Sequence, residues 1–348
     1  MSVFISKTRI FLIICLVVVV SAIAAAIYFN SWLVKSIAVA ENDRTVVVQK
    51  GQSLYGLAYQ LDQNNLISFP SLWVYYARFS RQTDIKAGEY RLNEIESPST
   101  LLATFNKGKV VQHRVTFIEG STAADVLSTL SKQESLDRVL PVIFDVSAPS
   151  LSELDVPHLE GWLYPDTYFY SAGETDVSLL LRAYNKMKKV LEDEWENRSP
   201  GLPLENAYEA LILASIVEKE TGAPHERAEI AGVFTRRLQR GMRLQTDPTV
   251  IYGMGEQYDG NIRRADLRRP TPYNTYTISG LPPTPIALAG REALHAVLHP
   301  ADGDSLYFVA KGDGTHYFSS TLEEHNAAVR RYQLSRKENY QSRFKQKK

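Results

Sequence analysis

An uncharged apolar stretch at residues 10–29 constrains the fold more than any other part of the chain. It has about the length that an α-helix needs to cross the hydrocarbon core of a bilayer. Lipid offers the backbone no hydrogen bonds, so a single spanning stretch of this length must be a helix. Lys7 and Arg9 precede it, and the positive-inside tendency predicts that residues 1–9 are cytoplasmic and the bulk of the chain lies outside. The stretch therefore predicts a single-pass transmembrane anchor.

A cleaved signal peptide is the alternative explanation of the same stretch. Ala38-Val39-Ala40 has the small residues of a cleavage site. The apolar stretch is longer than that of an ordinary signal peptide, however, and Trp32 and Lys35 separate it from this site. We therefore expect an uncleaved anchor, followed by a linker at residues 30–44.

Composition excludes several classes of protein and of site. The 348 residues include 39 Lys and Arg and 39 Asp and Glu, so the basic excess typical of nucleic-acid-binding domains is absent. The only cysteine, Cys15, lies in the apolar stretch, which excludes a thiol nucleophile in the rest of the chain. The basic C-terminal residues 333–348 predict a solvated tail.

A second helix carries the most informative carboxylate. Residues 207–221 are apolar nearly all the way round, as in a buried helix. At about 100° per residue, Glu218 falls on the stripe of Leu211 and Ala214. Gly222 is the expected residue after the helix end, so Glu218 lies in the last turn, where the helix dipole disfavours a negative charge. Burial and the dipole both raise the pKa of such a carboxyl and prepare it to donate a proton near neutral pH.

The pattern leaves a structural role open for the same residue. Glu218 would also suit an ion pair with an arginine or a simple contact with water. Glu220 lies beyond the apolar run on the stripe of Leu213, and we expect it to be solvated.

Several sequence blocks occur in a fixed order around this helix. They are LEGWLYPDTY at 159–168, IVEKET at 216–221, GVFTRRL at 232–238, GMRLQTDPTVIYG at 241–253, PYNTY at 272–276 and GLPP at 280–283. Together they resemble the YceG-like proteins, the MltG family of endolytic murein transglycosylases. The resemblance covers about residues 45–332, and separate blocks in the right order are far more specific than one short motif.

The resemblance implies a lyase that cleaves the MurNAc-β-1,4-GlcNAc bond within nascent peptidoglycan strands and so limits their length. It carries the family's catalytic glutamate onto Glu218, which would act as both acid and base without a cofactor or metal. The muramic acid's own 6-hydroxyl is the nucleophile, and the product has a 1,6-anhydro end. The resemblance also implies a bacterial inner-membrane protein with its catalytic domain in the periplasm, associated with penicillin-binding proteins of the wall-synthesis machinery.

The other candidate site residues come from the remaining blocks. They are Gln245, Asp247, Tyr273, Asn274, Tyr276 and Glu160. The tyrosines and the asparagine suit hydrogen bonding and stacking on N-acetyl sugars. Gln245 and Asp247 are candidates to orient the substrate or the acid, and an Asx turn before Pro248 is the alternative for Asp247. Glu160 and Asp166 flank an aromatic run and suit either the site or the fold.

The chain departs from the family pattern after Pro283. Thr284 stands where the family usually has glycine, and Ala289-Gly290 replaces the usual Pro-Gly. These differences leave open the shape of the part of the site that follows Pro283. They do not affect the assignment of Glu218 as the acid.

The expected fold class is α+β, because strands and helices do not alternate in a βαβ rhythm. Residues 45–107 predict a strand–helix–helix–strand module whose Gly51-Gln52-Ser53-Leu54 opening resembles a LysM module, a fold that elsewhere binds N-acetylglucosamine polymers. A small accessory domain without glycan binding is the alternative. We expect residues 108–332 to form the larger mixed α+β catalytic domain.

Other functions have less support in the sequence. Glu292, His295 and His299 share one helical face, but the His-Glu-x-x-His motif is absent, and we expect no metal site. A non-catalytic glycan-binding scaffold for wall synthases and a muramidase that hydrolyses with water remain as alternatives. The presence of Glu218 within its motif favours an enzyme over the scaffold.

Overall fold

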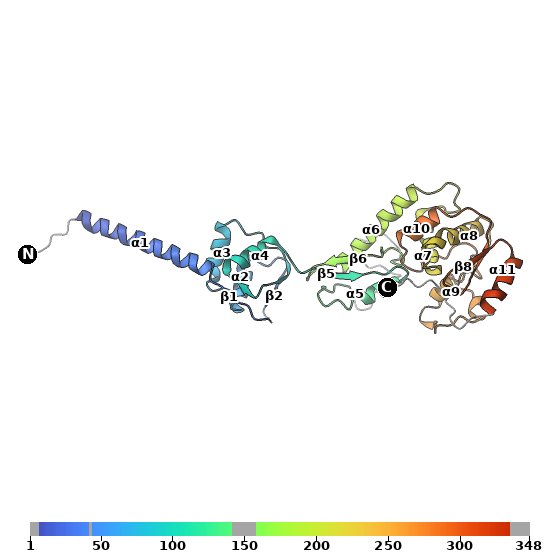
Figure 1. Cartoon of the computed structure of the whole chain (residues 1–348), viewed down its shortest axis with the longest axis horizontal. Coiled ribbons are helices and arrows are strands. Elements are labelled where there is room, and N and C mark those ends of the chain that lie inside the picture. Colours follow the sequence, from blue (N-terminus) through green and yellow to red (C-terminus); the bar gives the residue numbers. More distant parts are fainter. Residues whose placement is uncertain (1–6, 42–43, 141–157, 335–348) are drawn as a thin grey trace, which may run out of the picture. The chain divides into compact units, whose positions relative to one another are not determined.

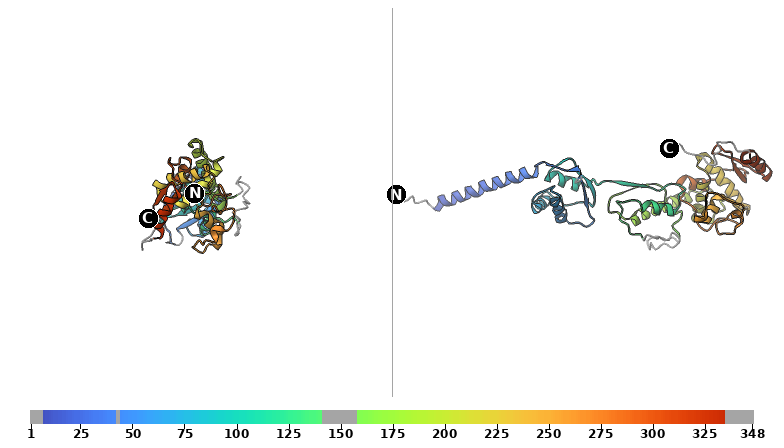
Figure 2. Two further views of the ribbon diagram at one scale, coloured as in Figure 1. Left: turned by 90° about the vertical axis from the view of Figure 1, so that its right-hand side faces the viewer. Right: turned by 90° about the horizontal axis from the view of Figure 1, so that it is seen from below.

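The computed structural model describes residues 7–41, 44–140 and 158–334, and the chain divides into two compact units. The first comprises Met1–His113, Ser135–Asp137 and Tyr170–Glu174, and the second comprises Arg114–Glu134, Arg138–Phe169 and Thr175–Lys348. Figures 1 and 2 show the elements in chain order from blue to red. Helices combine with short two-stranded sheets, which confirms the predicted α+β class. Most of the predicted cytoplasmic terminus and of the basic tail lies outside the described residues.

The first helix, α1 (Lys7–Leu33), contains the whole apolar stretch. An 18-residue window within its residues 9–33 has a mean hydropathy of 3.3 and is not buried in the protein. Within the described part of the chain, it is the one helix long and apolar enough to cross a membrane. Its presence is in keeping with a single-pass anchor, and its orientation in a membrane stays a prediction.

The region predicted as a linker is largely built into the first unit. Trp32 and Leu33 at the end of α1 are buried in its core. Beyond them, β1 (Ile37–Ala38) pairs antiparallel with β4 (Ile95–Glu96). The linker at residues 30–44 stays a prediction, although apolar side chains beyond the span find partners in the core.

The first unit has the predicted strand–helix–helix–strand order. The elements are β2 (Thr45–Val48), α2 (Leu54–Gln63), α3 (Pro70–Phe79) and β3 (Gly88–Arg91), followed after β4 by α4 (Pro98–Lys107). β2 and β3 pair antiparallel, and the Ser53 side chain caps α2 by accepting from the Gly56 N–H at 3.0 Å. Buried Trp73 of α3 donates its indole N–H to the Pro98 carbonyl at 2.8 Å. The likeness to a LysM module remains a prediction.

From His113 onward the chain is mostly helical. The elements are β5 (His113–Thr116), α5 (Ala123–Leu130), β6 (Thr167–Tyr170), α6 (Asp176–Glu196), α7 (Ala207–Glu220), η2 (Pro224–Glu226), α8 (Arg227–Gln239), α9 (Asp247–Met254), η3 (Gly255–Gln257), η4 (Asp266–Arg268), α10 (Arg291–Leu298), β7 (Tyr307–Ala310), β8 (His316–Ser319), α11 (Leu322–Val329) and η5 (Arg330–Leu334). α7 contacts α6, α8, α9 and α10. Residues 210–217 are all buried, which confirms the predicted buried helix. The second unit is therefore built around α7, whose C-terminal end carries Glu218.

Candidate active site

Glu218 lies in the last turn of α7, as predicted. The helix ends at Glu220, and the Thr221 N–H bonds to the Val217 carbonyl. Gly222 is therefore at the expected position, but it does not have the left-handed conformation expected of a glycine that ends a helix. The Glu218 side chain is only 6% exposed.

Two groups from other elements contact the Glu218 carboxylate. The Gly290 N–H, at the N-terminus of α10, donates to Oε2 at 3.1 Å. An Arg227 guanidinium nitrogen lies 3.6 Å from Oε1. Arg227 is also buried and forms a second ion pair with the exposed Glu292. The arginine pairing that the sequence left open is thus present.

Burial nevertheless raises the pKa of Glu218 above its ordinary value. The nearby negative charge of Glu119 acts in the same direction, and Glu292 adds a smaller effect. The Gly290 hydrogen bond and the Arg227 charge oppose them by favouring the carboxylate. The net result is a pKa above the ordinary value, reached although two groups around the carboxyl favour its charged form.

Glu119 is a neighbour of Glu218 that no sequence motif indicated. It is exposed, and its segment is held by a Gly120 N–H to Leu288 carbonyl bond and a Leu288 N–H to Ser121 carbonyl bond, both 2.8 Å. The Lys219 ammonium also donates to the Gly120 carbonyl at 2.8 Å. A Cβ atom on residue 290 would collide with the Glu119 carboxyl group, so glycine at 290 makes room for it.

The end of α7 also bonds to the loop that precedes α9. The Thr246 hydroxyl donates to the Glu220 carboxylate. Glu220 is half-buried, so its predicted solvation is wrong. The reason is that the following blocks fold back onto this end of the helix, a contact that helical periodicity does not reveal.

Gln245 and Asp247 flank Thr246. Gln245 has a left-handed backbone (φ 53°), and its side-chain oxygen accepts from Arg237 at 3.3 Å. Asp247 opens α9 and accepts a hydrogen bond from the Tyr276 hydroxyl at 2.6 Å. Burial, reinforced by the Asp247 charge, raises the pKa of Tyr276. The structure thus brings two of the predicted binding residues, Asp247 and Tyr276, into direct contact.

Asn274 is placed differently from the prediction. Its side chain is buried, with the residue 1% exposed. Its amide donates to the carbonyls of Asp266, Leu267 and Arg269 and accepts from the Tyr276 N–H. These hydrogen bonds join the side-chain amide to the backbone of the loop that contains Asn274. They therefore favour a structural role over the predicted contact with an N-acetyl sugar.

Glu160 and Tyr273 belong to one chain of contacting side chains, joined by hydrogen bonds and by a contact between two tyrosine rings. Glu160 accepts from the Ala123 N–H at 3.0 Å and from the Tyr252 hydroxyl at 3.2 Å. The Tyr252 and Tyr273 rings lie 4.9 Å apart, and the Tyr273 hydroxyl is 2.8 Å from the Thr284 hydroxyl. Burial raises the pKa of Glu160 to about 7. Thr284, which departs from the family pattern, is therefore an integral partner of Tyr273.

Asp166 lies apart from this chain. It forms an ion pair with Lys186, and the hydrogen bond from Lys186 holds the pKa of Asp166 below its ordinary value. This pairing favours a structural role over a place in the site.

One group of potential metal ligands occurs among the described residues. Glu194, His295 and His299 have ligand atoms within 4.8 Å of one another. His295 Nδ1 is 2.9 Å from a Glu194 oxygen, whereas Glu292 pairs with Arg227 instead. The sequence thus indicated the two histidines, but the acidic residue predicted beside them was Glu292 of their own helix. In the structure the acidic neighbour is Glu194 of α6. Glu194 is also paired with Arg291 at 3.1 Å, which accounts for the cluster without a metal.

The chain is similar to a family of known proteins over most of its length. The sequence model of the YceG-like family matches residues 46–331. The endolytic murein transglycosylase of Bacillus subtilis (strain 168) is 29% identical over 320 residues, covering 86% of this chain and 88% of that protein. The endolytic murein transglycosylase of Streptococcus pneumoniae serotype 2 (strain D39 / NCTC 7466) is 29% identical, covering 82% of this chain and 57% of that protein. The crystal structure of a putative YceG-like protein from Listeria monocytogenes matches with a TM-score of 0.48 and 29% identity, covering 84% of this chain and 99% of that one.

Proposed function

Because this chain belongs to the YceG-like family, we propose that it is an endolytic murein transglycosylase, the activity by which its curated relatives are named. The observation that supports this most directly is the buried Glu218 carboxyl with a raised pKa. It stands within the IVEKET block by which the chain resembles the family.

In the proposed reaction Glu218 completes one proton cycle. Its protonated form donates to the glycosidic oxygen, the bond from that oxygen to muramic acid C1 breaks, and positive charge develops on the sugar. The Glu218 carboxylate then takes the proton of the 6-hydroxyl, whose oxygen bonds to C1. The products are a 1,6-anhydro end and a free 4-hydroxyl, no water is consumed, and the acid is regenerated.

The neighbours of Glu218 suit both halves of this cycle. Burial and Glu119 favour the protonated form that starts it. Arg227 and the Gly290 N–H stabilise the carboxylate that forms midway. Asp247 and Tyr276, linked to each other, are the proposed substrate-binding pair, with Gln245, Tyr273 and Glu160 as further candidates.

The proposed setting is the bacterial inner membrane. α1 is the proposed single-pass anchor, with its N-terminus cytoplasmic and the second unit in the periplasm. There the enzyme would cut nascent strands internally, limit their length and associate with penicillin-binding proteins. The substrate supplies its own nucleophile, so the reaction needs no cofactor.

A hydrolysing muramidase is the second candidate, favoured by one observation. Glu119 is a second carboxylate near Glu218, and glycosidases that use water commonly employ two. The two reactions leave different chain ends.

The test is digestion of purified peptidoglycan by the full chain and by its Glu218→Gln variant, with the ends read by mass spectrometry. Anhydro-muramic ends from the wild type alone are expected. Reducing ends would establish the muramidase, and binding without cleavage would establish a glycan-binding scaffold. Activity retained by Glu218→Gln would overturn the assignment of the acid.

A further inference from the structure

α3 is apolar on two opposite sides. On the inner side Trp73 and Ala77 are fully buried in the first unit. The outer side has a second stripe with i, i+3, i+4, i+7 spacing, which consists of Leu72, Tyr75, Tyr76 and Phe79. Phe79 is 90% exposed and Tyr75 61%. A surface helix that serves only its own core has a polar outer side, so packing within this unit does not account for the outer stripe.

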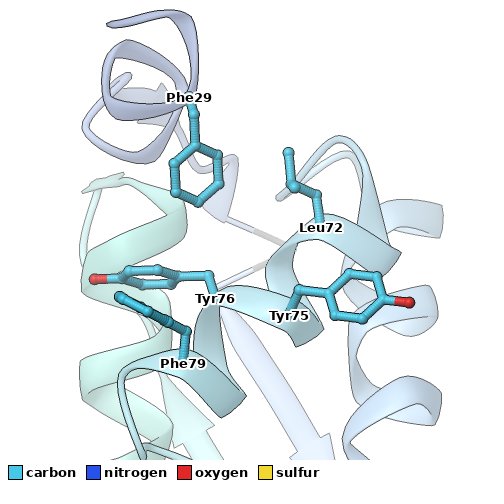
Figure 3. A pocket seen from close by; sticks show the side chains of 5 residues that line it. All are labelled: Phe29, Leu72, Tyr75, Tyr76 and Phe79. Atoms are coloured by element: carbon cyan, nitrogen blue, oxygen red, sulfur yellow. The ribbon is translucent and has the colours of Figure 1, made fainter. Parts of the chain in front are cut away.

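The outer stripe of α3 adjoins the end of the apolar stretch. Phe29 of α1 projects toward it, and these five side chains line a shallow apolar hollow of about 160 Å³ (Figure 3). The Phe29 and Tyr76 rings lie 6.1 Å apart. The buried Trp32, whose ring is 6.2 Å from that of Phe69, fixes the end of α1 in the same unit.

The position of Phe29 determines the depth at which the outer stripe would lie in a membrane that α1 crosses. It is the last residue of the apolar stretch 10–29, which at 1.5 Å per residue spans roughly 30 Å, the thickness of the hydrocarbon core. In a spanning α1, Phe29 therefore lies at the edge of the hydrocarbon. Tyr and Trp side chains concentrate at this level of a membrane, because they are apolar at one end and polar at the other.

A second hollow beside α1 is more polar. It has a volume of about 480 Å³, and its lining includes Lys35, Asn65 and Ser68. An ammonium, an amide and a hydroxyl suit the phosphate and glycerol groups of lipid heads. An apolar and a polar hollow thus flank the same end of the proposed span, in keeping with the chemistry of the interfacial layer.

We propose that the outer stripe of α3 is seated in the interfacial layer of the bilayer that α1 crosses, with lipid as its occupant. Leu72, Tyr75 and Phe79 contact the upper parts of the acyl chains, and the first unit lies on the membrane instead of swinging free on its anchor. This inference rests on the membrane span of the proposed function, but not on catalysis. Continuity of the stripe with Phe29 favours lipid over a sugar or a protein partner.

The test uses the full chain in vesicles of phosphatidylethanolamine and phosphatidylglycerol. Phe79→Cys and Tyr75→Cys are made in a Cys15→Ser background and labelled with an environment-sensitive fluorophore. Tyr59→Cys on α2 is the matched control, because Tyr59 is also an exposed tyrosine (52%) but does not line the hollow. The labels at 75 and 79 are expected to show blue-shifted emission and severalfold stronger quenching by doxyl lipids than the label at 59.

A separate measurement tests the premise that α1 spans the membrane. The native Cys15 of the unmodified chain, which lies within the stretch, is expected to resist a membrane-impermeant maleimide. Water-like emission at 75 and 79 with Cys15 protected would overturn the interfacial seat alone. A reactive Cys15 would overturn the span as well. A blue shift at 75 and 79 that appears only on addition of glycan or another protein would assign the stripe to that partner and overturn the lipid assignment. Peptidoglycan cleavage, measured on the same vesicles, reports the proposed activity independently.

Discussion

The Gly290 N–H donates a hydrogen bond of 3.1 Å to the Glu218 carboxylate and thereby joins the N-terminus of α10 to the C-terminus of α7. The two helix ends act oppositely on this group. The end of α7 disfavours a negative charge, whereas the start of α10 favours it. Gly290 has an ordinary extended backbone (φ −77°), so the glycine is needed for the space that Glu119 occupies and not for its conformation.

Gly290→Ala is expected to leave the hydrogen bond in place but displace the Glu119 carboxyl group. Because Glu119 is exposed, its side chain can swing away, and the fold should be retained. Loss of the nearby negative charge lowers the pKa of Glu218, so the alkaline limb of the kcat/KM profile moves to lower pH. The double variant with Glu119→Gln should show no further shift. Additive shifts in the double variant would contradict the prediction that Gly290→Ala acts by displacing Glu119.

Glu119→Gln alone tests the electrostatic effect directly. A general acid loses activity as pH rises through its pKa. Removing the like charge lowers that pKa, and the alkaline limb is expected to shift to lower pH. Retained anhydro ends at low pH would exclude Glu119 as an obligatory second catalyst. Complete loss of activity at every pH would instead favour the two-carboxylate muramidase.

Arg227→Gln is expected to act in the opposite direction. Loss of its positive charge raises the pKa of Glu218 and moves the alkaline limb to higher pH. Stability should also fall, by about 1–3 kcal/mol, because two carboxylates lose their partner. Arg227→Lys, which keeps the charge, is the control and should shift the profile less. An unchanged alkaline limb in Arg227→Gln would show that the arginine does not tune the acid.

Local periodicity predicted the placement of Glu218. An apolar pattern with the helical period determines which side of α7 is buried, and the end of the apolar run determines the last turn. The apolar span and the strand–helix–helix–strand order of the first unit were predictable for the same reason. Each depends on neighbours along the chain.

The surroundings of Glu218 were not predictable in this way. Glu119, Arg227 and Gly290 come from separate segments and meet only in the folded unit. Asn274 lies in a block typical of the family, but its burial follows from how its own loop closes. A short polar side chain in a proline- and tyrosine-rich loop suits either a ligand or the backbone, and the sequence does not distinguish them.

Asn274→Ala is expected to reduce the free energy of unfolding by roughly 1–3 kcal/mol, because three carbonyls of its loop lose the donor that the buried amide provides. Urea unfolding of the detergent-solubilised chain measures this loss. Asn274→Asp restores the acceptor for the Tyr276 N–H but not the donors, so it should be destabilised too. Unchanged stability with a raised KM would instead support the contact with sugar that the sequence predicted.

Glu160 gives a stability prediction that is independent of catalysis. Burial raises its pKa from 4.5 to about 7 in the folded protein. Between these values the folded state binds a proton that the unfolded state has lost. The contribution of Glu160 to stability is therefore fully present below about pH 4.5 and is lost as the pH rises through about 7, by at most about 3 kcal/mol.

Glu160→Gln removes this titration and keeps an oxygen to accept from the Ala123 N–H. The Tyr252 hydroxyl can accept from the new amide instead of donating to a carboxylate. The Tm of the wild type should fall more steeply than that of the variant between pH 5 and pH 8 by differential scanning calorimetry, since the window follows from the two pKa values. Parallel curves would mean that Glu160 stays ionised in the fold. The variant should still cleave peptidoglycan if Glu160 serves the fold, and lose cleavage without loss of Tm if it contacts the substrate.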